Sequence, residues 1–344
     1  MEEVAVDARQ TVRQGGAPRL NGAPPLYAAL DLGTNNCRLL MALPWGSGFR
    51  VVDAFSRTTR LGEGLAVTGV LSEPAILRTL DALRFCAQRM ARRGVTRSRV
   101  VATEACRRAA NCAAFVERVA LEAGLTMEII SAEEEARLAL AGCAPLLDRD
   151  LADALVFDIG GGSTELIHVE VTPGGETVRS FASLPLGVVT LAEEQGAALL
   201  TAAGYERTVA LVAAQLAGFD ADGRLAALVR QQKVQMLGTS GTVTTLAGVH
   251  LRLPRYDRAV VDGITLSFAE IAAVSHSLTR AGLDERAAHP CIGRERADLV
   301  VAGCAILDAI CRLWPVGRLR VADRGVREGV LLSMMRSDQN QGSD

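Results

Sequence analysis

A short pattern that occurs twice constrains the fold of this chain most. Residues 29–40 contain an apolar run that ends in Asp31, a turn of small residues and a second apolar run, and residues 156–167 repeat this order around Asp158. Such a pattern predicts a strand, a tight turn and a returning strand. Because the two copies stand about one domain length apart, the sequence predicts two α/β domains that begin with similar hairpins.

The turn of each hairpin has residues that are suited to binding anions. Glycine lets backbone N–H groups approach a ligand closely, and threonine and serine hydroxyl groups add further donors. The candidate phosphate-binding residues in the two turns are Gly33, Thr34, Asn35, Asn36, Gly160, Gly161, Gly162, Ser163 and Thr164. The aspartates that end the two strands, Asp31 and Asp158, are candidate ligands of a divalent cation such as Mg²⁺. One hairpin of this kind is common in antiparallel sheets, so the prediction depends on the pair.

A third segment with the same chemistry follows a predicted strand. Residues 237–245 lead from that strand into a helix, where free N–H groups and the positive end of the helix dipole favour an anion. The candidate phosphate-binding residues of this segment are Gly238, Thr239, Ser240 and Gly241. A plain glycine turn with serine or threonine capping is the alternative interpretation.

Two segments contribute candidate charged residues. Arg107 stands after a predicted strand, at the end where ligands of open α/β sheets bind, and is a candidate phosphate clamp, with a solvated loop arginine as the alternative. The acidic run 133–135 begins a helix in which Ser131 and Glu134 form a capping box. Because successive helical residues point about 100° apart, the three carboxylates cannot share one role, so one of them is a candidate general base.

The predicted elements alternate between strands and helices, which favours layered α/β domains. The predicted strands are residues 26–31, 37–43, 49–57, 98–102, 127–130, 155–159, 163–171, 177–184, 233–238 and 318–321. The predicted helices include residues 74–93 and 112–123 and one that begins at the capping box of Ser267 and Glu270. The expected organisation is a disordered tail at 1–25, a first domain of 26–150 with a helix at 323–336, a second domain of 151–322, and a disordered tail at 337–344.

Composition excludes several classes of protein. The net charge of −2 gives no bulk attraction for a nucleic acid polymer or an anionic membrane. No apolar stretch reaches the roughly 18 residues that a membrane span needs, and the first residues lack a signal-peptide pattern. Eight cysteines without a Cys-x-x-Cys pair and four scattered histidines favour reduced thiols over disulfides or a zinc site. The sequence therefore predicts a protein of the cytoplasm.

Seven motifs, taken together and in this order, resemble the exopolyphosphatase/guanosine pentaphosphate phosphohydrolase family. The motifs are residues 31–36, 103–111, 130–138, 158–166, 184–187, 238–241 and 327–329. Each motif alone is weakly specific, whereas the combination, which extends over about residues 26–335, is highly specific.

The resemblance implies a fold and a reaction. The fold is that of actin, Hsp70 and sugar kinases, with two ribonuclease-H-like domains around a central cleft. The reaction is Mg²⁺-dependent hydrolysis of a terminal phosphoanhydride, with inorganic polyphosphate as the predicted substrate and guanosine pentaphosphate as the alternative. By matched position, Glu135 is the general base and Arg107 contacts phosphate. Asp158 and Glu165 match acidic positions that place metal and water, and Asp31 is the equivalent position in the first hairpin.

The chain departs from the family pattern in two ways. Long members carry an added C-terminal domain of the HD type, so a chain that stops at 344 resembles a short form, and Ala132 replaces a glycine that commonly precedes the acidic run. A kinase or ATPase of the same fold and a non-catalytic nucleotide sensor remain as alternatives. A homodimer also remains open, because the helices within residues 267–313 could pack inside the chain or against a second copy.

Overall fold

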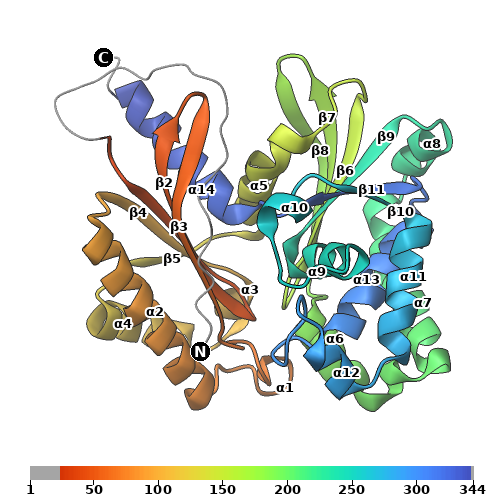
Figure 1. Ribbon diagram of the computed structural model, residues 1–344, viewed down its shortest axis with the longest axis horizontal. Coiled ribbons are helices and arrows are strands. Elements are labelled where there is room, and N and C mark those ends of the chain that lie inside the picture. The colour runs from red at the N-terminus through yellow and green to blue at the C-terminus, as the bar shows by residue number, and fades with distance from the viewer. Residues whose placement is uncertain (1–23, 342–344) are drawn as a thin grey trace. The chain divides into compact units, whose positions relative to one another are not determined.

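The computed structural model describes residues 24–341, so residues 1–23 of the predicted tail at 1–25 and the last residues, 342–344, lie outside the described part. The chain divides into two compact units, each built on one mixed sheet (Figure 1). Among the described residues, unit 1 consists of residues 24–142 and 326–341, and unit 2 is Cys143–Gly325.

The sheet of unit 1 has the order β3-β2-β1-β4-β5. Its strands are β1 (Tyr27–Leu32), β2 (Asn36–Trp45), β3 (Gly48–Thr58), β4 (Arg97–Ala102) and β5 (Met127–Ile129). The first three strands are antiparallel neighbours, and β1, β4 and β5 run parallel to one another. This order and these directions are those of a ribonuclease-H-like domain.

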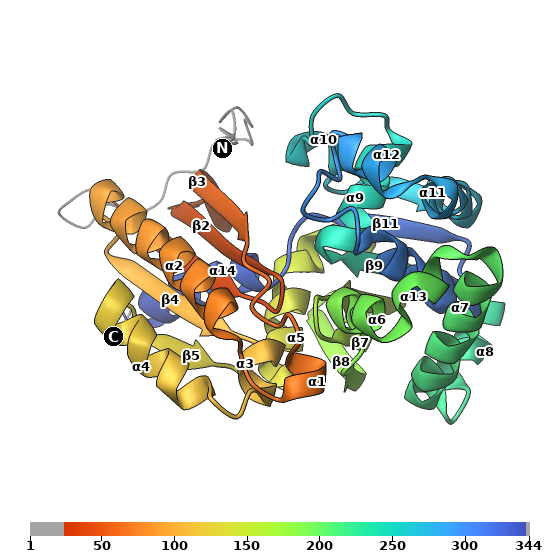
Figure 2. The same ribbon diagram turned by 90° about the horizontal axis from the view of Figure 1, so that it is seen from below.

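Alternating residues of β1 divide the core of unit 1 into two layers. Ala28, Leu30 and Leu32 pack with α2 (Glu73–Arg93) and α4 (Cys112–Ala123). Tyr27 and Ala29 pack with α5 (Ala132–Cys143) and α14 (Val326–Gln341), because successive side chains of a strand point to opposite faces (Figure 2). Two short helices, α1 (Leu65–Thr68) and α3 (Glu104–Arg108), complete unit 1.

The helix α14 packs very closely on α5. A Cβ atom added to Gly329 of α14 would lie 2.0 Å from the carbonyl oxygen of Leu138 of α5. Real Cβ contacts are never this short, so the glycine is required by the close approach of the two backbones. The last helix of the chain therefore supports the helix that carries the acidic run.

The sheet of unit 2 has the order β10-β11-β9-β6-β7-β8. Its strands are β6 (Asp153–Ile159), β7 (Thr164–Thr172), β8 (Gly175–Leu184), β9 (Val234–Thr239), β10 (Thr265–Ser267) and β11 (Arg318–Ala322). From β8 to β11, the order and directions repeat those of unit 1, and β10 adds an antiparallel edge strand. The fold is therefore mixed α/β with two ribonuclease-H-like sheets.

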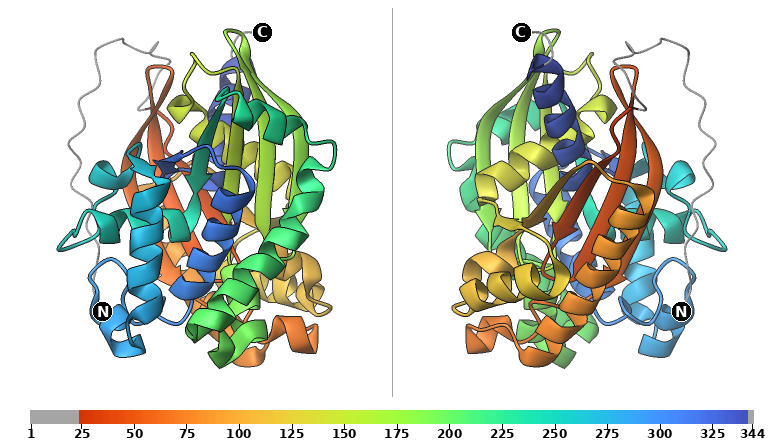
Figure 3. Two further views of the ribbon diagram at one scale, coloured as in Figure 1. Left: turned by 90° about the vertical axis from the view of Figure 1, so that its right-hand side faces the viewer. Right: turned by 90° about the vertical axis from the view of Figure 1, so that its left-hand side faces the viewer.

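The helices of unit 2 enclose a large apolar core around this sheet. They are α6 (Val188–Gln195), α7 (Ala202–Leu216), α8 (Arg224–Arg230), α9 (Ser240–His250), α10 (Arg258–Val261), α11 (Phe268–Arg280), α12 (Leu283–Ala288) and α13 (Val300–Leu313), with single 3₁₀ turns at Ala144–Leu146, Gly196–Leu200 and Ala217–Asp220. The helices α7 and α13 lie side by side (Figure 3). The predicted capping box of Ser267 and Glu270 opens α11.

The predicted boundaries differ from those of the structure by several residues where the units divide, and the last helix ends later than predicted. The sequence predicts a disordered tail from residue 337, whereas α14 continues to Gln341. The physical reason is Asp338, whose Oδ2 accepts hydrogen bonds from Tyr27 Oη at 2.8 Å and from Arg97 Nε at 3.1 Å and so ties the last turns of the helix to the sheet. No helix within residues 24–341 has both the length and the apolar character that a bilayer span requires.

Candidate active site

The parallel strands of unit 1 bring three predicted site segments to one edge of the sheet. Leu32 lies opposite Ala102, and Ala102 lies opposite Ile129, so β1, β4 and β5 end together. The backbone N–H of Thr103 then donates to the carbonyl of Leu32 at 3.2 Å. The predicted phosphate-binding turn at residues 33–36, called the first loop below, starts from this edge. The segment with Arg107 and the helix with Glu135 start from it as well.

The first loop is held by a segment that the sequence did not identify. The N–H groups of Thr59 and Arg60 donate to the carbonyl of Asn35 at 2.9 and 3.0 Å, and the N–H of Gly62 donates to the carbonyl of Thr34 at 2.9 Å. A Cβ atom on Gly62 would lie 2.3 Å from Cγ2 of Thr34. The contacts of residues 59–62 with the loop are made by backbone atoms, so only the fold shows that this segment supports the loop.

The side chain of Asn35 lies in this loop with an unsatisfied polar atom. It is buried, and within residues 24–341 its Oδ1 has no hydrogen-bond partner. A buried amide oxygen without a partner costs free energy, and the amide can present either its oxygen or its nitrogen. A ligand bound at the loop would supply the missing partner.

Asp31 lies at the start of the first loop in a strongly electrostatic environment. Its cross-strand neighbour is Arg38. Burial raises the pKa of the Asp31 carboxyl above its ordinary value, although the charges of Arg38 and Arg327 act in the opposite direction and Glu328 adds to the rise. A bound cation would favour the charged form of this carboxylate.

Glu135 is fixed by the arginine that the sequence singled out. Arg107 Nη1 donates to Glu135 Oε2 at 2.8 Å and to the carbonyl of Ile130 at 3.0 Å. The other side of the guanidinium donates to Glu104 Oε2 at 2.9 and 3.2 Å. The side chains of Glu135 and Arg107 are only 12% and 17% exposed, so this contact is shielded from water. Although burial lowers it, the two carboxylates raise the pKa of Arg107 overall.

The other two carboxylates of the acidic run have different surroundings. The backbone N–H of Glu134 donates to Ser131 Oγ at 3.1 Å, and its carboxylate accepts from Arg99 at 2.6 Å. Glu133 is exposed. The three acids therefore have different surroundings, and the one that contacts Arg107 is Glu135.

The second loop, the turn at residues 160–164 in unit 2, contacts the backbone of residues 187–189 directly. The N–H of Gly160 donates to the carbonyl of Ser163 at 2.8 Å, which closes the turn. The N–H groups of Val188 and Val189 donate to the carbonyls of Gly160 and Gly161 at 3.0 and 2.8 Å. The turn is therefore closed from within and held by the backbone of residues 188–189.

Two carboxylates of unit 2 face each other across this hairpin. Asp158 lies directly opposite Glu165 in the antiparallel register, so both side chains are on the same face of the sheet. Glu165 is 2% exposed, and its Oε1 accepts from Ser183 Oγ at 2.8 Å. Thr164 Oγ1 donates to the carbonyl of Leu186 at 2.6 Å, so this threonine hydroxyl is engaged within the protein.

This pair fits a magnesium ion as a partial ligand set. Carboxylates directly opposite each other repel, and a divalent cation would offset that repulsion. Mg²⁺ is commonly held by one or two carboxylates together with water and substrate phosphates. Within residues 24–341, no group of three or more His, Cys, Asp or Glu side chains is gathered as an all-protein metal cage.

The third loop, residues 238–241, lies beside the second at the same edge of the unit 2 sheet. Thr239 lies opposite Asp158 in the parallel register. Ser240 Oγ donates to the carbonyl of Ile159 at 2.7 Å, and Ser240 adopts a φ of 90°, which is strained for a residue other than glycine. The Thr239 hydroxyl donates to the carbonyl of Arg324. It therefore does not cap the first N–H groups of the 11-residue helix α9.

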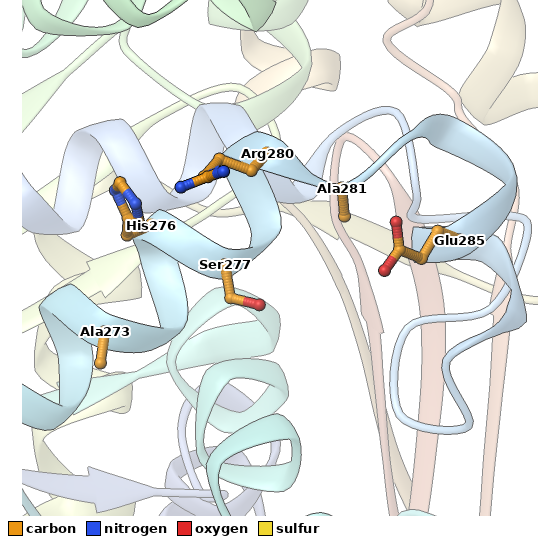
Figure 4. Close-up of a pocket in the computed structure, with 6 residues that line it drawn as sticks. All are labelled: Ala273, His276, Ser277, Arg280, Ala281 and Glu285. Carbon is orange, nitrogen blue, oxygen red and sulfur yellow. The ribbon is translucent and has the colours of Figure 1, made fainter.

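The structure thus gathers the predicted residues into two sets. In unit 1, Asp31, Gly33–Asn36, Arg107 and Glu135 belong to segments that start from one sheet edge. In unit 2, Asp158, Gly160–Thr164, Glu165 and Gly238–Gly241 do the same. A separate pocket on α11 and α12 is lined by Ala273, His276, Ser277, Arg280, Ala281 and Glu285 and contains none of the predicted site residues (Figure 4).

Comparisons with known proteins show the family and the fold. The sequence model of the Ppx/GppA phosphatase family matches residues 45–338. A crystal structure of the Aquifex aeolicus member of that family is 30% identical, with 91% of this chain and 98% of that chain covered and a TM-score of 0.73. A crystal structure of an exopolyphosphatase-like protein is 28% identical, covers 90% and 97% of the two chains, and has a TM-score of 0.81.

A third solved structure shows the same fold at lower identity. It is an exopolyphosphatase from Cytophaga hutchinsonii, 22% identical over 91% of this chain and 98% of that chain, with a TM-score of 0.80. The family match covers most of the chain, and the two-sheet fold is shared with solved members along nearly their whole length. This protein therefore belongs to the Ppx/GppA phosphatase family and is a hydrolase.

Proposed function

We propose that the protein hydrolyses the terminal phosphoanhydride of inorganic polyphosphate and releases orthophosphate. The observation that carries the proposal is the contact of Glu135 with Arg107, which fixes a shielded carboxylate at the sheet edge where the first phosphate loop begins. Family membership supports the class of reaction, and one solved structure with this fold is that of an exopolyphosphatase.

Glu135 acts as the general base. One carboxylate oxygen accepts a hydrogen bond from Arg107, which leaves the orientation of the group fixed, and the carboxylate accepts a proton from the attacking water. As that proton leaves, the water oxygen bonds to the terminal phosphorus and the bridging P–O bond breaks. The electron pair of the broken bond goes to the leaving polyphosphate, which is shorter by one unit.

The loops hold the negatively charged substrate. Phosphoryl transfer depends mainly on positioning and on neutralising charge, because the protein does little covalent chemistry. The backbone N–H groups of Gly33–Asn36 do this for unit 1, and those of Gly160–Ser163 and the start of α9 do it for unit 2. The hydrogen bonds from residues 59–62 to the first loop and from residues 188–189 to the second keep these donors in place before substrate binds.

Asp158 and Glu165 are the residues that would hold Mg²⁺, and Asp31 is the corresponding carboxylate of unit 1. The bound ion would supply positive charge that neutralises phosphate oxygens. In its absence, the two opposed carboxylates of the hairpin would repel a polyanion.

The test is orthophosphate release by the purified protein with Mg²⁺. Initial rates would be compared on short polyphosphate, long polyphosphate and guanosine pentaphosphate, and kcat/KM calculated for each. The proposal expects the largest kcat/KM on polyphosphate. A larger kcat/KM on guanosine pentaphosphate would assign that nucleotide instead, since both end in the same phosphoanhydride and selectivity lies in contacts with the rest of the substrate. Hydrolysis of ATP alone would indicate an ATPase, and tight binding without turnover would indicate a nucleotide sensor.

A further inference from the structure

Arg324 lies in the turn after β11, at the same edge of the unit 2 sheet as the second and third phosphate loops. β11 ends at Ala322, which is opposite Thr239, and Thr239 is opposite Asp158. The carbonyl of Arg324 accepts hydrogen bonds from the Thr239 hydroxyl and, at 3.3 Å, from the thiol of Cys143. The backbone of Arg324 is therefore attached directly to the third loop.

The side chain of Arg324 is oriented by a chain of polar contacts. Arg324 Nε donates to Asp262 Oδ2 at 2.7 Å, and the other oxygen of Asp262 accepts from the backbone N–H of Asp323 at 3.0 Å. The Tyr256 hydroxyl donates to Asp323 Oδ2 at 2.7 Å. The Asp262 side chain is 12% exposed and that of Arg324 is 34% exposed, so the anchoring carboxylate is largely shielded while part of the Arg324 side chain reaches solvent.

The two Nη groups of Arg324 distinguish it from Arg107. Arg107 uses its guanidinium nitrogens on Glu104, Glu135 and the carbonyl of Ile130. For Arg324, the contacts within residues 24–341 involve Nε alone, and neither Nη has a protein partner there. A guanidinium that is anchored on one side and open on the other can bind two phosphate oxygens at once.

We propose that Arg324 binds a phosphate group of the substrate in unit 2 and that Asp262 positions it. The proposal deepens the proposed function, on which it rests for the nature of the ligand, an oligophosphate. The third loop offers only the partial charges of N–H groups and a helix dipole, whereas Arg324 adds a full positive charge beside it. Because the polar contacts already fix the side chain, less conformational entropy is lost when the phosphate binds.

The first experiment compares Arg324→Gln with a matched surface arginine. Arg312 also pairs with an acid, since its guanidinium donates to Glu206 at 2.7 and 2.9 Å. It lies in the last turn of α13, just before β11 begins, whereas Arg324 follows the end of β11. Loss of one charge-assisted contact should raise the KM for tripolyphosphate about 10-fold in Arg324→Gln, with kcat changed less than about 3-fold. Arg312→Gln should keep the wild-type KM. An Arg324→Gln protein with wild-type KM would overturn the proposal.

Two further variants separate phosphate binding from a structural role. Arg324→Lys should show an intermediate KM, because lysine keeps the charge but not the two-pronged contact. Asp262→Asn should also raise KM, since the guanidinium then loses its charged anchor. Millimolar guanidinium ion should lower the KM of Arg324→Ala toward wild type. A fall in melting temperature and kcat together, without a change in KM or any rescue, would assign Arg324 to stability alone.

A binding measurement keeps this proposal separate from the proposed function. Calorimetric titration of tripolyphosphate with Mg²⁺, on proteins that also carry Glu135→Gln, reads affinity without turnover. If the wild type releases no orthophosphate but Arg324→Gln weakens binding about 10-fold, the hydrolytic function fails and the Arg324 site stands. If the wild type hydrolyses polyphosphate and Arg324→Gln leaves both KM and Kd unchanged, the Arg324 site alone fails. Absence of both binding and hydrolysis would overturn both.

Discussion

A methyl group on Gly187 would lie 2.3 Å from the carbonyl carbon of Gly161. The backbone around Gly187 therefore packs directly against the second loop, and the N–H groups of the next two residues donate hydrogen bonds to carbonyls of that loop. This contact joins two segments that are separated in the sequence by β7 and β8. The shape of the loop is consequently set by a residue that has no side chain to contribute chemistry.

Gly187→Ala should distort the second loop. The added Cβ would lie closer to the Gly161 backbone than any real Cβ contact, and overpacking of this kind costs about 1–3 kcal/mol. We expect a lower melting temperature and a raised KM for polyphosphate. Gly218→Ala is the control, because nothing lies within 4 Å of a Cβ at that position. Equal stability and KM in the two variants would show that the loop does not depend on this contact.

Glu135→Gln should keep the fold and lose turnover. The amide keeps the shape of the carboxylate but cannot take a proton, and loss of a general base costs about 10² to 10⁴ in rate. The measurement is kcat for orthophosphate release, with circular dichroism to check folding. Glu133→Gln is the matched control, since Glu133 is exposed in the same helical turn. Turnover close to wild type in Glu135→Gln would remove this residue from the mechanism.

Activity should depend on Mg²⁺ through the carboxylates of the unit 2 hairpin. A chelator should abolish orthophosphate release, and added Mg²⁺ should restore it. Asp158→Asn and Glu165→Gln should each raise the Mg²⁺ concentration needed for half-maximal rate by about 10-fold or more, because each removes a charged ligand. Glu170→Gln, at the other end of β7, should behave as wild type. An unchanged Mg²⁺ requirement in both site variants would place the metal elsewhere.

The contact between Tyr27 and Asp338 should contribute stability over a defined range of pH. The hydrogen bond from Tyr27, together with Arg97, lowers the pKa of Asp338 below its ordinary value of 3.8, so its contribution is present above about pH 4 and is lost in acid. Burial and Asp338 raise the pKa of Tyr27 from 10.0 to about 12, so the contribution of Tyr27 is present below pH 10 and is lost as the pH rises toward 12.

The variant Tyr27→Phe tests over which pH range the tyrosine hydroxyl contributes to stability. Urea unfolding at pH 7 should show a loss of about 1 kcal/mol, the net value of one hydrogen bond. Between pH 10 and pH 12, the free energy of unfolding should fall more steeply in the wild type than in Tyr27→Phe, because phenylalanine does not ionise. Parallel pH profiles would mean that the tyrosine hydroxyl is not protected in the folded protein.

The regular elements could be predicted from the sequence because their signals are local. The ten predicted strands correspond to β1–β9 and β11 with ends within a few residues, since period-2 alternation and glycine turns mark them clearly. β10 and α3 were not predicted, and the bounds of α1, α6, α7, α8, α10 and α12 were not predicted either. β10 has three residues that directly precede the capping box of α11, and α3 has five, so both are too short for a periodic pattern to be recognised.

The site could be predicted only in part, for a similar reason. The three loops are continuous in sequence, so their composition indicated anion binding. Glu135 and Arg107 were each singled out, but their contact depends on the parallel register of β4 and β5, which no local pattern specifies. Gly62 and Gly187 support the loops because they lack a side chain, and composition alone does not indicate such a role. The orientation of Arg324 depends on Asp262, which lies far away in sequence, so no local pattern indicates it.

The crossing of α14 over α5 has a consequence for sequence variation. A Cβ atom at position 329 would lie 2.0 Å from the carbonyl oxygen of Leu138, so the two helices approach more closely than any side chain would allow. Any other residue at this position would push α14 away from the helix that carries the acidic run. The exposed turns of α14 are therefore free to vary, whereas this single crossing point demands glycine.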